Sequence, residues 1–492
     1  MTSITTKLAN CSVGIAFLAL GGTTSPASAN DRGPYLEQCQ VEGISGHVDC
    51  GSIEVPENWQ DPDGRNISLN IVVSRATEVG AKLADPLVFV AGGPGIDVTS
   101  SAAWRSQSWA KIRTTRDLVF IDARGTGGKK ALKCDYPGPP EAYATIIGKI
   151  WSADRFRHCL HHLGANHDLS QYTTINIATD LAYAVKLLGY RNANFVGSSY
   201  GSRVVMELMS HRPDLVRTGI TVGMAIPRKN GINDLGKQFK DALEARVRQC
   251  NQTPACNQVY PTFYEDFTKI VRRLDEGPIE VELENQALGG TEKISLSKGS
   301  FLHIVRNLLY DARRSAHIPK LIQEVAMGRN NGLLADFAQR FEPGQAKMLA
   351  DAMWATIQCS EDFKGTDLDH VQKSSVTNFY GLDRVTNIAK LCGFWPQAPH
   401  PEAHSEYAAS AHPLLIFNGS ADPATPLSWA TDLASQRSNT FVTVVPGGSH
   451  GLGFVWDNCL VPYADTFLTT QDDSGLRDAQ ACIARTPMPE FK

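Results

Sequence analysis

The chain has 492 residues, of which 42% are hydrophobic and 20% are charged, and its 47 Lys and Arg against 51 Asp and Glu give a net charge of −4. This near balance excludes a general nucleic-acid-binding protein, which needs a basic surface. The hydrophobic content excludes a disordered chain, and the length suits one large core with an inserted domain or several domains.

The first 29 residues are predicted to be a secretory signal peptide. Lys7 is the only charged residue among the first 30, an apolar stretch spans 13–20, and Ala27-Ser28-Ala29 has the small-residue pattern of a cleavage site. The apolar stretch is far shorter than the ~20 residues that span a bilayer, so a stable membrane anchor is not expected. The sequence therefore predicts cleavage after Ala29 and a secreted or periplasmic protein.

Ten cysteines remain after removal of this segment, an even number that suits an oxidising compartment. Pairing of sequence neighbours is the simplest connectivity, although the sequence alone leaves the other pairings open. The neighbour pairs are Cys39 with Cys50, Cys134 with Cys159, Cys250 with Cys256, Cys359 with Cys392, and Cys459 with Cys482. There is no C-x-x-C motif, and the His-rich stretch 158–167 matches no zinc pattern, so no metal site is expected.

Short apolar runs along the chain predict the strands of a sheet that is buried on both faces. A β-branched run at 67–73 comes first and is expected to pair with 53–55. The later runs lie at 87–90, 118–121, 194–196, 218–222, 414–417 and 441–445. Helical patterns at 177–188 and 202–209 alternate with them, which predicts an α/β fold with a mostly parallel sheet and helices on both faces.

The alternation of strands and helices stops between residues 228 and 412. Amphipathic patterns at 235–247, 263–274 and 302–309 predict helices in this span. We interpret it as a helical cap or lid that is inserted into the core. Residues 30–227 and 413–492 are then the first and the C-terminal parts of that core.

The segment Gly197-Ser198-Ser199-Tyr200-Gly201 matches the G-x-S-x-G pattern and stands between a predicted strand and a predicted helix. In that setting a sharp turn exposes the central serine above the N-terminus of the helix. Without that setting, the same pentapeptide is an ordinary Ser/Gly turn. Ser199 is therefore the candidate nucleophile.

A serine hydroxyl needs a base, and the base needs a group that orients it. Asp422 and His450 follow the last two predicted strands, in the order Ser, acid, His that this arrangement requires. Taken singly, Asp422 is typical of a turn or helix cap and His450 of a loop. Together with Ser199 they indicate a catalytic triad. His412 is the competing base, but it precedes its strand and is expected at the opposite edge of the sheet.

Acyl transfer also needs two N–H donors for the developing oxyanion. One is expected from Tyr200, the residue after the nucleophile. The other is expected from the Gly-rich loop after 87–90, most simply from Gly93 or Gly92, because Pro94 has no N–H.

These motifs resemble those of the α/β-hydrolase peptidases of the proline iminopeptidase and tripeptidyl aminopeptidase family. The family motifs H-G-G-P-G, D-x-R-G-x-G, G-x-S-Y-G, D-P-x-T-P and G-H-G correspond to 91–95, 122–127, 197–201, 422–426 and 449–451. Ala91 and Ser449 depart from the family pattern, standing where a histidine and a glycine are usual. Cys359, Cys392 with 393–396, and the pair of Cys459 and Cys482 resemble the secreted tripeptidyl aminopeptidase branch, and the resemblance covers most of the mature chain.

The resemblance implies an α/β-hydrolase fold with an inserted cap, and a secreted serine peptidase that requires no cofactor. The expected activity is removal of residues or short peptides from the free N-terminus of a short peptide. The resemblance also implies that acidic cap residues bind the substrate amine. Glu361 and Asp362 are the candidates, the alternative being a solvated acidic pair beside a disulfide.

Two other functions remain open at this point. An esterase, lactonase or amidase would use the same triad on small non-peptide substrates, because one fold hosts many activities. A non-catalytic binding protein would reuse the scaffold, but such proteins usually lose a triad member. The sequence leaves the side-chain specificity, the number of residues released and the oligomeric state open.

Overall fold

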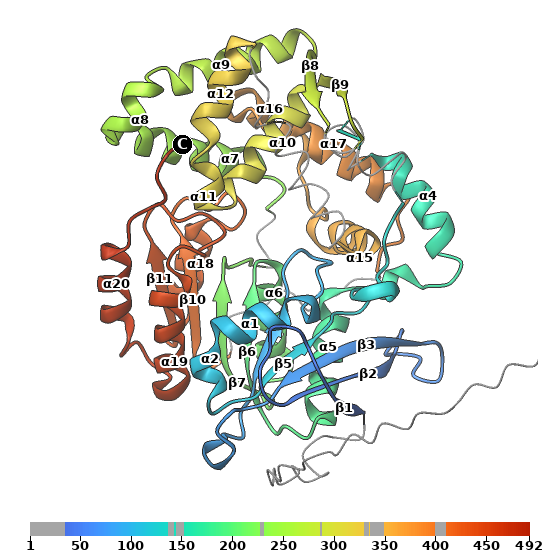
Figure 1. Ribbon diagram of the computed structural model, residues 1–492. Helices are drawn as coiled ribbons and strands as arrows, with labels where there is room; N and C mark the ends of the chain where they lie inside the picture. The colour runs from blue at the N-terminus through green and yellow to red at the C-terminus, as the bar shows by residue number, and fades with distance from the viewer. Residues whose placement is uncertain are drawn as a thin grey trace, which may run out of the picture.

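The computed structural model describes residues 35–135, 142–143, 152–226, 231–285, 288–328, 334, 349–398 and 410–492. The predicted signal peptide lies outside these residues. Figure 1 shows an α/β core around one large sheet, with a second, mostly helical layer above one edge of that sheet.

The core contains a nine-stranded sheet in the order β1-β2-β3-β5-β4-β6-β7-β10-β11. β1, β2 and β3 run antiparallel to their neighbours, and the strands from β5 to β11 pair in parallel. The strands are β1 (Leu36–Cys39), β2 (Val48–Pro56), β3 (Asn66–Ser74), β4 (Leu87–Val90), β5 (Leu118–Ile121), β6 (Ala193–Ser198), β7 (Val216–Val222), β10 (Leu414–Gly419) and β11 (Thr440–Val445).

The predicted α/β-hydrolase sheet is confirmed, and each predicted strand coincides with an observed one. The expected pairing of 53–55 with 67–73 occurs between β2 and β3, where Val55 is opposite Ile67. β1 is an addition, because its sequence LEQC carries no alternation that would single it out.

Both faces of the sheet are covered, which explains the continuous apolar runs. Val88 and Val90 of β4 pack into the core that includes helix α5 (Thr174–Leu187) and helix α6 (Tyr200–His211). Leu87 and Phe89 pack into the core on the other face, which includes helix α19 (Val461–Thr470). Successive side chains of a strand point to opposite faces, so an all-apolar strand needs two cores. The other core helices are α1 (Ala102–Ser108), α2 (Ala110–Arg113), α4 (Ala153–Leu163), α18 (Leu427–Ser435) and α20 (Leu476–Arg485).

Within its described residues, the cap is helical with one exception. The predicted helices are present as α7 (Leu235–Gln252), α9 (Phe263–Glu276) and α10 (Lys298–Leu309). The remaining cap helices are α8 (Pro254–Val259), α11 (Ala312–Ser315), α12 (Ile318–Met327), α15 (Asp351–Ile357), α16 (Leu368–Asn378) and α17 (Leu382–Cys392), with a π-helical turn at Gln358–Asp362. A two-stranded hairpin of β8 (Ile279–Glu284) and β9 (Thr291–Leu296) also belongs to it. This hairpin is an addition to the helical patterns found in the sequence, because 279–284 alternates apolar and acidic residues with the period of a half-buried strand.

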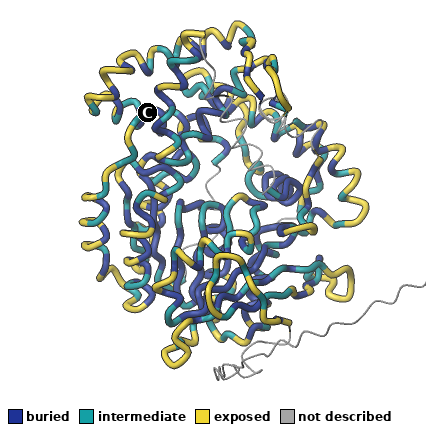
Figure 2. Tube along the Cα trace, in the orientation of Figure 1, coloured by how far each residue is buried: buried dark blue, intermediate teal, exposed yellow. Residues whose placement is uncertain are grey.

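Buried residues lie on both faces of the sheet, and the cluster on one face continues into the cap, where Phe239 and Ile304 belong to the same apolar cluster as Val88 (Figure 2). The chain end returns to the cap, where Tyr260 donates its hydroxyl to the backbone carbonyl of Lys492 at 2.8 Å.

Disulfides join sequence neighbours throughout the described part of the chain, as the sequence analysis expected. The ten cysteines form five bonds, with Cα–Cα distances between 5.0 and 5.7 Å. The bonds join Cys39 to Cys50, Cys134 to Cys159, Cys250 to Cys256, Cys359 to Cys392, and Cys459 to Cys482. Each bond closes a short local loop, so none of them ties the cap directly to the sheet strands.

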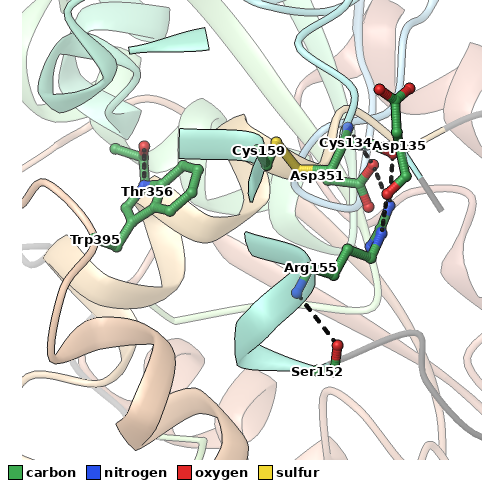
Figure 3. Close-up of a disulfide and its surroundings, with 8 residues drawn as sticks. All are labelled: Cys134, Asp135, Ser152, Arg155, Cys159, Asp351, Thr356 and Trp395. Carbon is green, nitrogen blue, oxygen red and sulfur yellow. Dashed lines mark hydrogen bonds and ion pairs between the residues drawn. A yellow bond between two sulfur atoms is a disulfide. The ribbon is translucent and has the colours of Figure 1, made fainter. Parts of the chain in front are cut away.

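Contacts from helix α4 and from the chain after β5 hold helix α15 against the core. Arg155 of α4 forms a fully buried ion pair with Asp351 at 2.9 Å, and Asp351 also accepts the N–H of Cys134 at 3.1 Å. The disulfide between Cys134 and Cys159 joins the same helix α4 to the chain that follows β5 (Figure 3). These contacts fix the base of the cap beside the loop that follows β4.

Candidate active site

Ser199 occupies a sharp turn between β6 and α6. Its backbone has φ 53° and ψ −124°, a region that non-glycine residues enter only at a cost of about 1–3 kcal/mol. Gly197 and Gly201 make the turn possible: a Cβ on Gly197 would overlap the carbonyl oxygen of Gly201, and one on Gly201 would lie 2.6 Å from the carbonyl oxygen of Ala91. The Ser199 N–H donates to the carbonyl of Val222 at 2.8 Å, which ties the turn to the end of β7.

Asp422 and His450 meet at the carboxyl ends of β10 and β11. His450 Nδ1 and Asp422 Oδ2 are 2.7 Å apart. Asp422 is buried and also accepts the hydroxyl of Thr425 at 2.7 Å and the N–H groups of Ala424 and Thr425 at 2.7 and 2.9 Å.

Burial raises the pKa of the Asp422 carboxyl, but the charge and hydrogen bond of His450 and the bonds from Thr425 more than offset it, so the pKa lies below its ordinary value. An ionised carboxylate at this position accepts the proton of Nδ1–H. Nε2 of His450 is then the nitrogen that can accept a proton.

Gly223 brings the histidine to the serine side of the sheet. It follows Val222, the residue that binds the Ser199 N–H, and has φ +67°. A Cβ on Gly223 would lie 2.8 Å from Cε1 of His450 and 2.9 Å from Oγ1 of Thr425, so a side chain does not fit. The sequence analysis missed Gly223, although a glycine directly after the predicted strand 218–222 is a signal of close backbone approach.

The loop after β4 lies against the same serine. A Cβ on Gly92 would lie 3.1 Å from Cβ of Ser199, closer than ordinary contacts, so a glycine favours this close approach of the backbone. Gly93 has φ +112°. Among the described residues, the N–H groups of Gly92 and Gly93 have no hydrogen-bond acceptor. The N–H of Tyr200 opens α6, where the first N–H groups of a helix have no acceptor within the helix.

Two contacts hold this loop in place. Asp122 accepts the N–H groups of Val98 and Thr99, each at 2.9 Å. The carbonyl of Gly95 accepts the N–H of Ala350, the residue before α15, at 2.7 Å. The loop is therefore connected to the core on one side and to the base of the cap on the other.

Glu361 and Asp362 lie in the π-helical turn that follows α15, and they contact α6. Arg203 of α6 pairs with Glu361 at 3.4 Å and with Asp362 at 2.6 Å. Glu361 also accepts the N–H of Thr174 at 2.7 Å and the hydroxyl of the same residue, and its side chain is 3% exposed against 20% for Asp362. Thr174 in turn binds the hydroxyl of Tyr200 at 2.7 Å, which connects the acidic pair to the residue after Ser199.

Arg246 links the cap to the histidine loop, a role that the sequence analysis did not anticipate. It is buried in α7 and donates to the carbonyl of Gly447 at 3.2 Å and to the hydroxyl of Ser449 at 3.1 Å. Burial lowers the pKa of Arg246 to about 10, opposed by the charge of Asp311. Ser449, which departs from the G-H-G motif, thus has a partner in the cap.

Two further residues, Arg124 and His412, lie apart from the Asp422–His450 pair. Arg124 is fully buried and forms two hydrogen bonds of 2.7 Å with Asp180, as expected of a residue that supports loops. His412 precedes β10, whereas His450 follows β11 in the same parallel pair, so the two histidines lie at opposite edges of the sheet.

Metal-binding clusters and membrane-spanning helices are both absent from the described residues. These residues contain no group of three or more His, Cys, Asp or Glu side chains arranged to hold a metal ion. In the same residues, no helix has the length and apolar character needed to cross a bilayer.

Comparison with known proteins supplies independent information. Family models described as "alpha/beta hydrolase fold" and "TAP-like protein" match residues 85–279 and 377–476. Serine protease Hip1 of Mycobacterium tuberculosis (strain ATCC 25618 / H37Rv) is 26% identical over 457 residues, which cover 86% of each chain. The tripeptidyl aminopeptidase of Streptomyces coelicolor (strain ATCC BAA-471 / A3(2) / M145) is 22% identical over 498 residues, 96% of this chain and 90% of the relative.

A third relative carries a different activity in its name. Carboxylesterase B of Mycobacterium tuberculosis (strain ATCC 25618 / H37Rv) is 24% identical over 445 residues, 84% of this chain and 82% of the relative. The sheet topology, the two family matches and the peptidase relatives agree with the resemblance drawn from the motifs. The chain has the α/β-hydrolase fold and is a serine hydrolase, and the family matches and named relatives support its similarity to the tripeptidyl aminopeptidase-like peptidases.

Proposed function

We propose that this peptidase is an exopeptidase that acts on the free N-terminus of short peptides through a triad of Ser199, His450 and Asp422. The observation that carries the proposal is the packing of the Asp422–His450 pair against Gly223, next to the carbonyl that binds the Ser199 N–H. This packing supports a serine, a base and an orienting acid acting as one unit.

The reaction follows from these roles. Oγ of Ser199 attacks the scissile carbonyl carbon while Nε2 of His450 takes its proton. The tetrahedral intermediate collapses, and His450 gives that proton to the leaving amine, which leaves an ester between Ser199 and the N-terminal fragment. Water then attacks the ester, its proton passes to His450 and on to Oγ, and the acid product departs. Asp422 stays ionised throughout and stabilises the imidazolium.

The oxyanion is assigned to backbone donors. Tyr200 supplies one N–H, and Gly93 or Gly92 supplies the other. Their lack of acceptors within the described chain supports this role, because unpaired N–H groups aimed at the site need no reorganisation during the reaction. Loss of one such donor costs ~10²–10³ in kcat in serine proteases.

The acidic pair is proposed to bind the substrate's ammonium group. Glu361 and Asp362 both pair with Arg203 of α6, and Glu361 is linked through Thr174 to Tyr200, the residue after Ser199, so two carboxylates lie close to the proposed nucleophile. Asp362 is the more exposed of the two, so it contacts the amine, and Glu361 holds Arg203 and Thr174 in place.

A matched substrate set tests the proposal. Free-amine tripeptidyl and aminoacyl arylamides, their N-acetylated forms and short acyl esters are assayed with the wild type, Ser199→Ala and Asp362→Asn. We expect turnover of free-amine amides that is lost on acetylation and with Ser199→Ala, and a raised KM with Asp362→Asn. Turnover that is equal for free and acetylated amides would contradict the exopeptidase assignment.

The second candidate function is that of an esterase with the same triad, and the relative named carboxylesterase B favours keeping it. It predicts ester turnover that depends on Ser199 and no turnover of any arylamide. The same assay therefore separates the two functions.

Export completes the proposal. The five disulfides support an oxidising compartment, and the predicted signal peptide would direct the protein to the periplasm or the medium. N-terminal sequencing of the mature protein tests the cut after Ala29.

The proposal also divides the chain into two core parts, 30–227 and 413–492, and a cap, 228–412. Limited proteolysis tests this division.

A further inference from the structure

Arg306 of α10 is a buried cation without an acidic partner. Its exposed fraction is 5%, its Nε has no hydrogen-bond partner, and no Asp or Glu among the described residues pairs with it. Its guanidinium instead lies over the rings of Tyr310 and Tyr380, with Cζ 4.8 and 5.7 Å from their centroids. The hydroxyl of Tyr380 is also buried without a partner.

Other buried arginines in the described chain are compensated in two ways: some donate to backbone carbonyls, as Arg113, Arg246 and Arg437 do, and others pair with carboxylates. Arg124, Arg155 and Arg203 each have a carboxylate oxygen within 2.9 Å. A buried charge is costly unless it is paired, and arginine does not lose its proton in proteins. The missing partner of Arg306 is therefore expected to come from outside the described chain.

The position of Arg306 relates it to the active site. Tyr310 is four residues further along the chain, and its ring meets the ring of His450 edge to face at 5.1 Å. The carbonyl of Tyr310 also accepts the N–H of Gly451 at 2.6 Å. Burial disfavours the charge of Arg306, but Tyr310, Tyr380 and Asp422 more than offset this and raise its pKa, so the group lies within the electrostatic reach of the triad acid.

We propose that Arg306 binds a carboxylate on the leaving portion of the substrate. The inference rests on the proposed function, in which His450 protonates the leaving amine, so groups beyond His450 face the leaving portion. The acidic pair contacts α6 on the serine side, whereas Arg306 lies behind Tyr310 on the histidine side. Opposite charges then stand on the two sides of the scissile bond, an arrangement that selects short peptides with a free amine and a nearby carboxylate.

The carboxylate has two possible sources, the C-terminus of a short peptide or an acidic side chain just after the cleaved bond. Binding is measured by calorimetry on Ser199→Ala, so that no turnover is needed. The ligands are a series of alanine oligopeptides, each as the free acid, as the carboxamide, and as a carboxamide with Asp in place of one alanine. The set is repeated in Ser199→Ala with Arg306→Met, with Arg306→Lys, and with Arg273→Met as a control on the exposed face of α9.

A charge-assisted hydrogen bond predicts free-acid binding about 10- to 100-fold tighter than carboxamide binding, and this preference disappears with Arg306→Met. Arg306→Lys keeps part of the preference, and Arg273→Met keeps all of it. If an Asp residue restores tight binding of the carboxamide peptide, the carboxylate that Arg306 binds belongs to a side chain of the substrate. If Asp does not restore it, that carboxylate is the C-terminus of the peptide. Equal binding of acid and carboxamide, a preference that survives Arg306→Met, or no binding of any peptide overturns the proposal.

Kinetics separate this inference from the proposed function. Wild type and Arg306→Met are compared on a tripeptidyl arylamide, whose leaving group has no carboxylate, and on the free-acid peptides. We expect the ratio of kcat/KM on the free acids to kcat/KM on the arylamide to fall 10- to 100-fold with Arg306→Met. Carboxylate-dependent binding without turnover of any peptide would remove the exopeptidase function and leave the role of Arg306 standing.

Discussion

Replacement of Gly223 by alanine tests the close contact between Gly223 and His450 on which the proposed triad depends. The new Cβ would lie 2.8 Å from Cε1 and 3.0 Å from Nδ1 of His450, whereas ordinary contacts begin at 3.4 Å. The imidazole or the end of β7 must therefore move by about 0.6 Å. Since a misplacement of ~1 Å in an active site costs ~10²-fold in rate, we expect kcat/KM to fall by about 10- to 100-fold.

The backbone adds a separate cost to stability. Gly223 has φ +67°, and an L-residue in the left-handed region costs about 1–2 kcal/mol. Gly189 is the matched control, because it has φ +86° and nothing within 4 Å of a Cβ. Gly189→Ala should lose similar stability in urea unfolding and keep wild-type kcat/KM on a free-amine arylamide. Wild-type activity in Gly223→Ala, or an equal loss of activity in Gly189→Ala, would refute the reasoning.

Three further predictions concern single contacts. Thr425→Val removes the hydroxyl that donates to Asp422, a charge-assisted bond of about 1.5–3 kcal/mol. The kcat/KM should therefore fall by about 10- to 100-fold with little change in Tm. An unchanged kcat/KM would contradict this role of Thr425. Arg155→Met leaves the Asp351 carboxylate buried without its arginine, and it should lower the free energy of unfolding in urea by about 3–5 kcal/mol. A loss below about 1 kcal/mol would show that this ion pair contributes no more than an ion pair on the surface. The lowered pKa of Asp422 makes its contribution to stability complete above the ordinary value of 3.8, and that contribution is lost as the pH falls through the lower folded-state value. Asp422→Asn should therefore lose less stability than the wild type between about pH 5 and pH 3, and parallel curves would contradict the shift.

The sheet could be predicted because its strands carry a strong signal. A run such as 118–121 is apolar at every position only because both faces of β5 are buried, and it ends where the strand ends. The strands of the β8–β9 hairpin each have one exposed face, so their sequence signal is weaker. The segments on both sides have helical patterns, and the hairpin was therefore not predicted.

The candidate site also contains residues that the sequence predicts and residues that it does not. Ser199, Asp422 and His450 follow strand ends in a fixed order, so local sequence was enough to select them. Gly223 and Arg246 act through contacts between segments far apart in the chain, such as the 3.1 Å bond from Arg246 to Ser449. A glycine after a strand signals close backbone approach, as at Gly223, but local sequence does not say which residue lies opposite, because the fold decides that.

The central claim is that Ser199 is the nucleophile and that His450 activates it. The most direct measurement is covalent labelling by a fluorophosphonate, with the modified residue identified by mass spectrometry. We predict one adduct on Ser199 that persists in Ser198→Ala, disappears in Ser199→Ala and forms far more slowly in His450→Ala. An adduct on Ser198, or peptide turnover that continues in Ser199→Ala, would contradict the account.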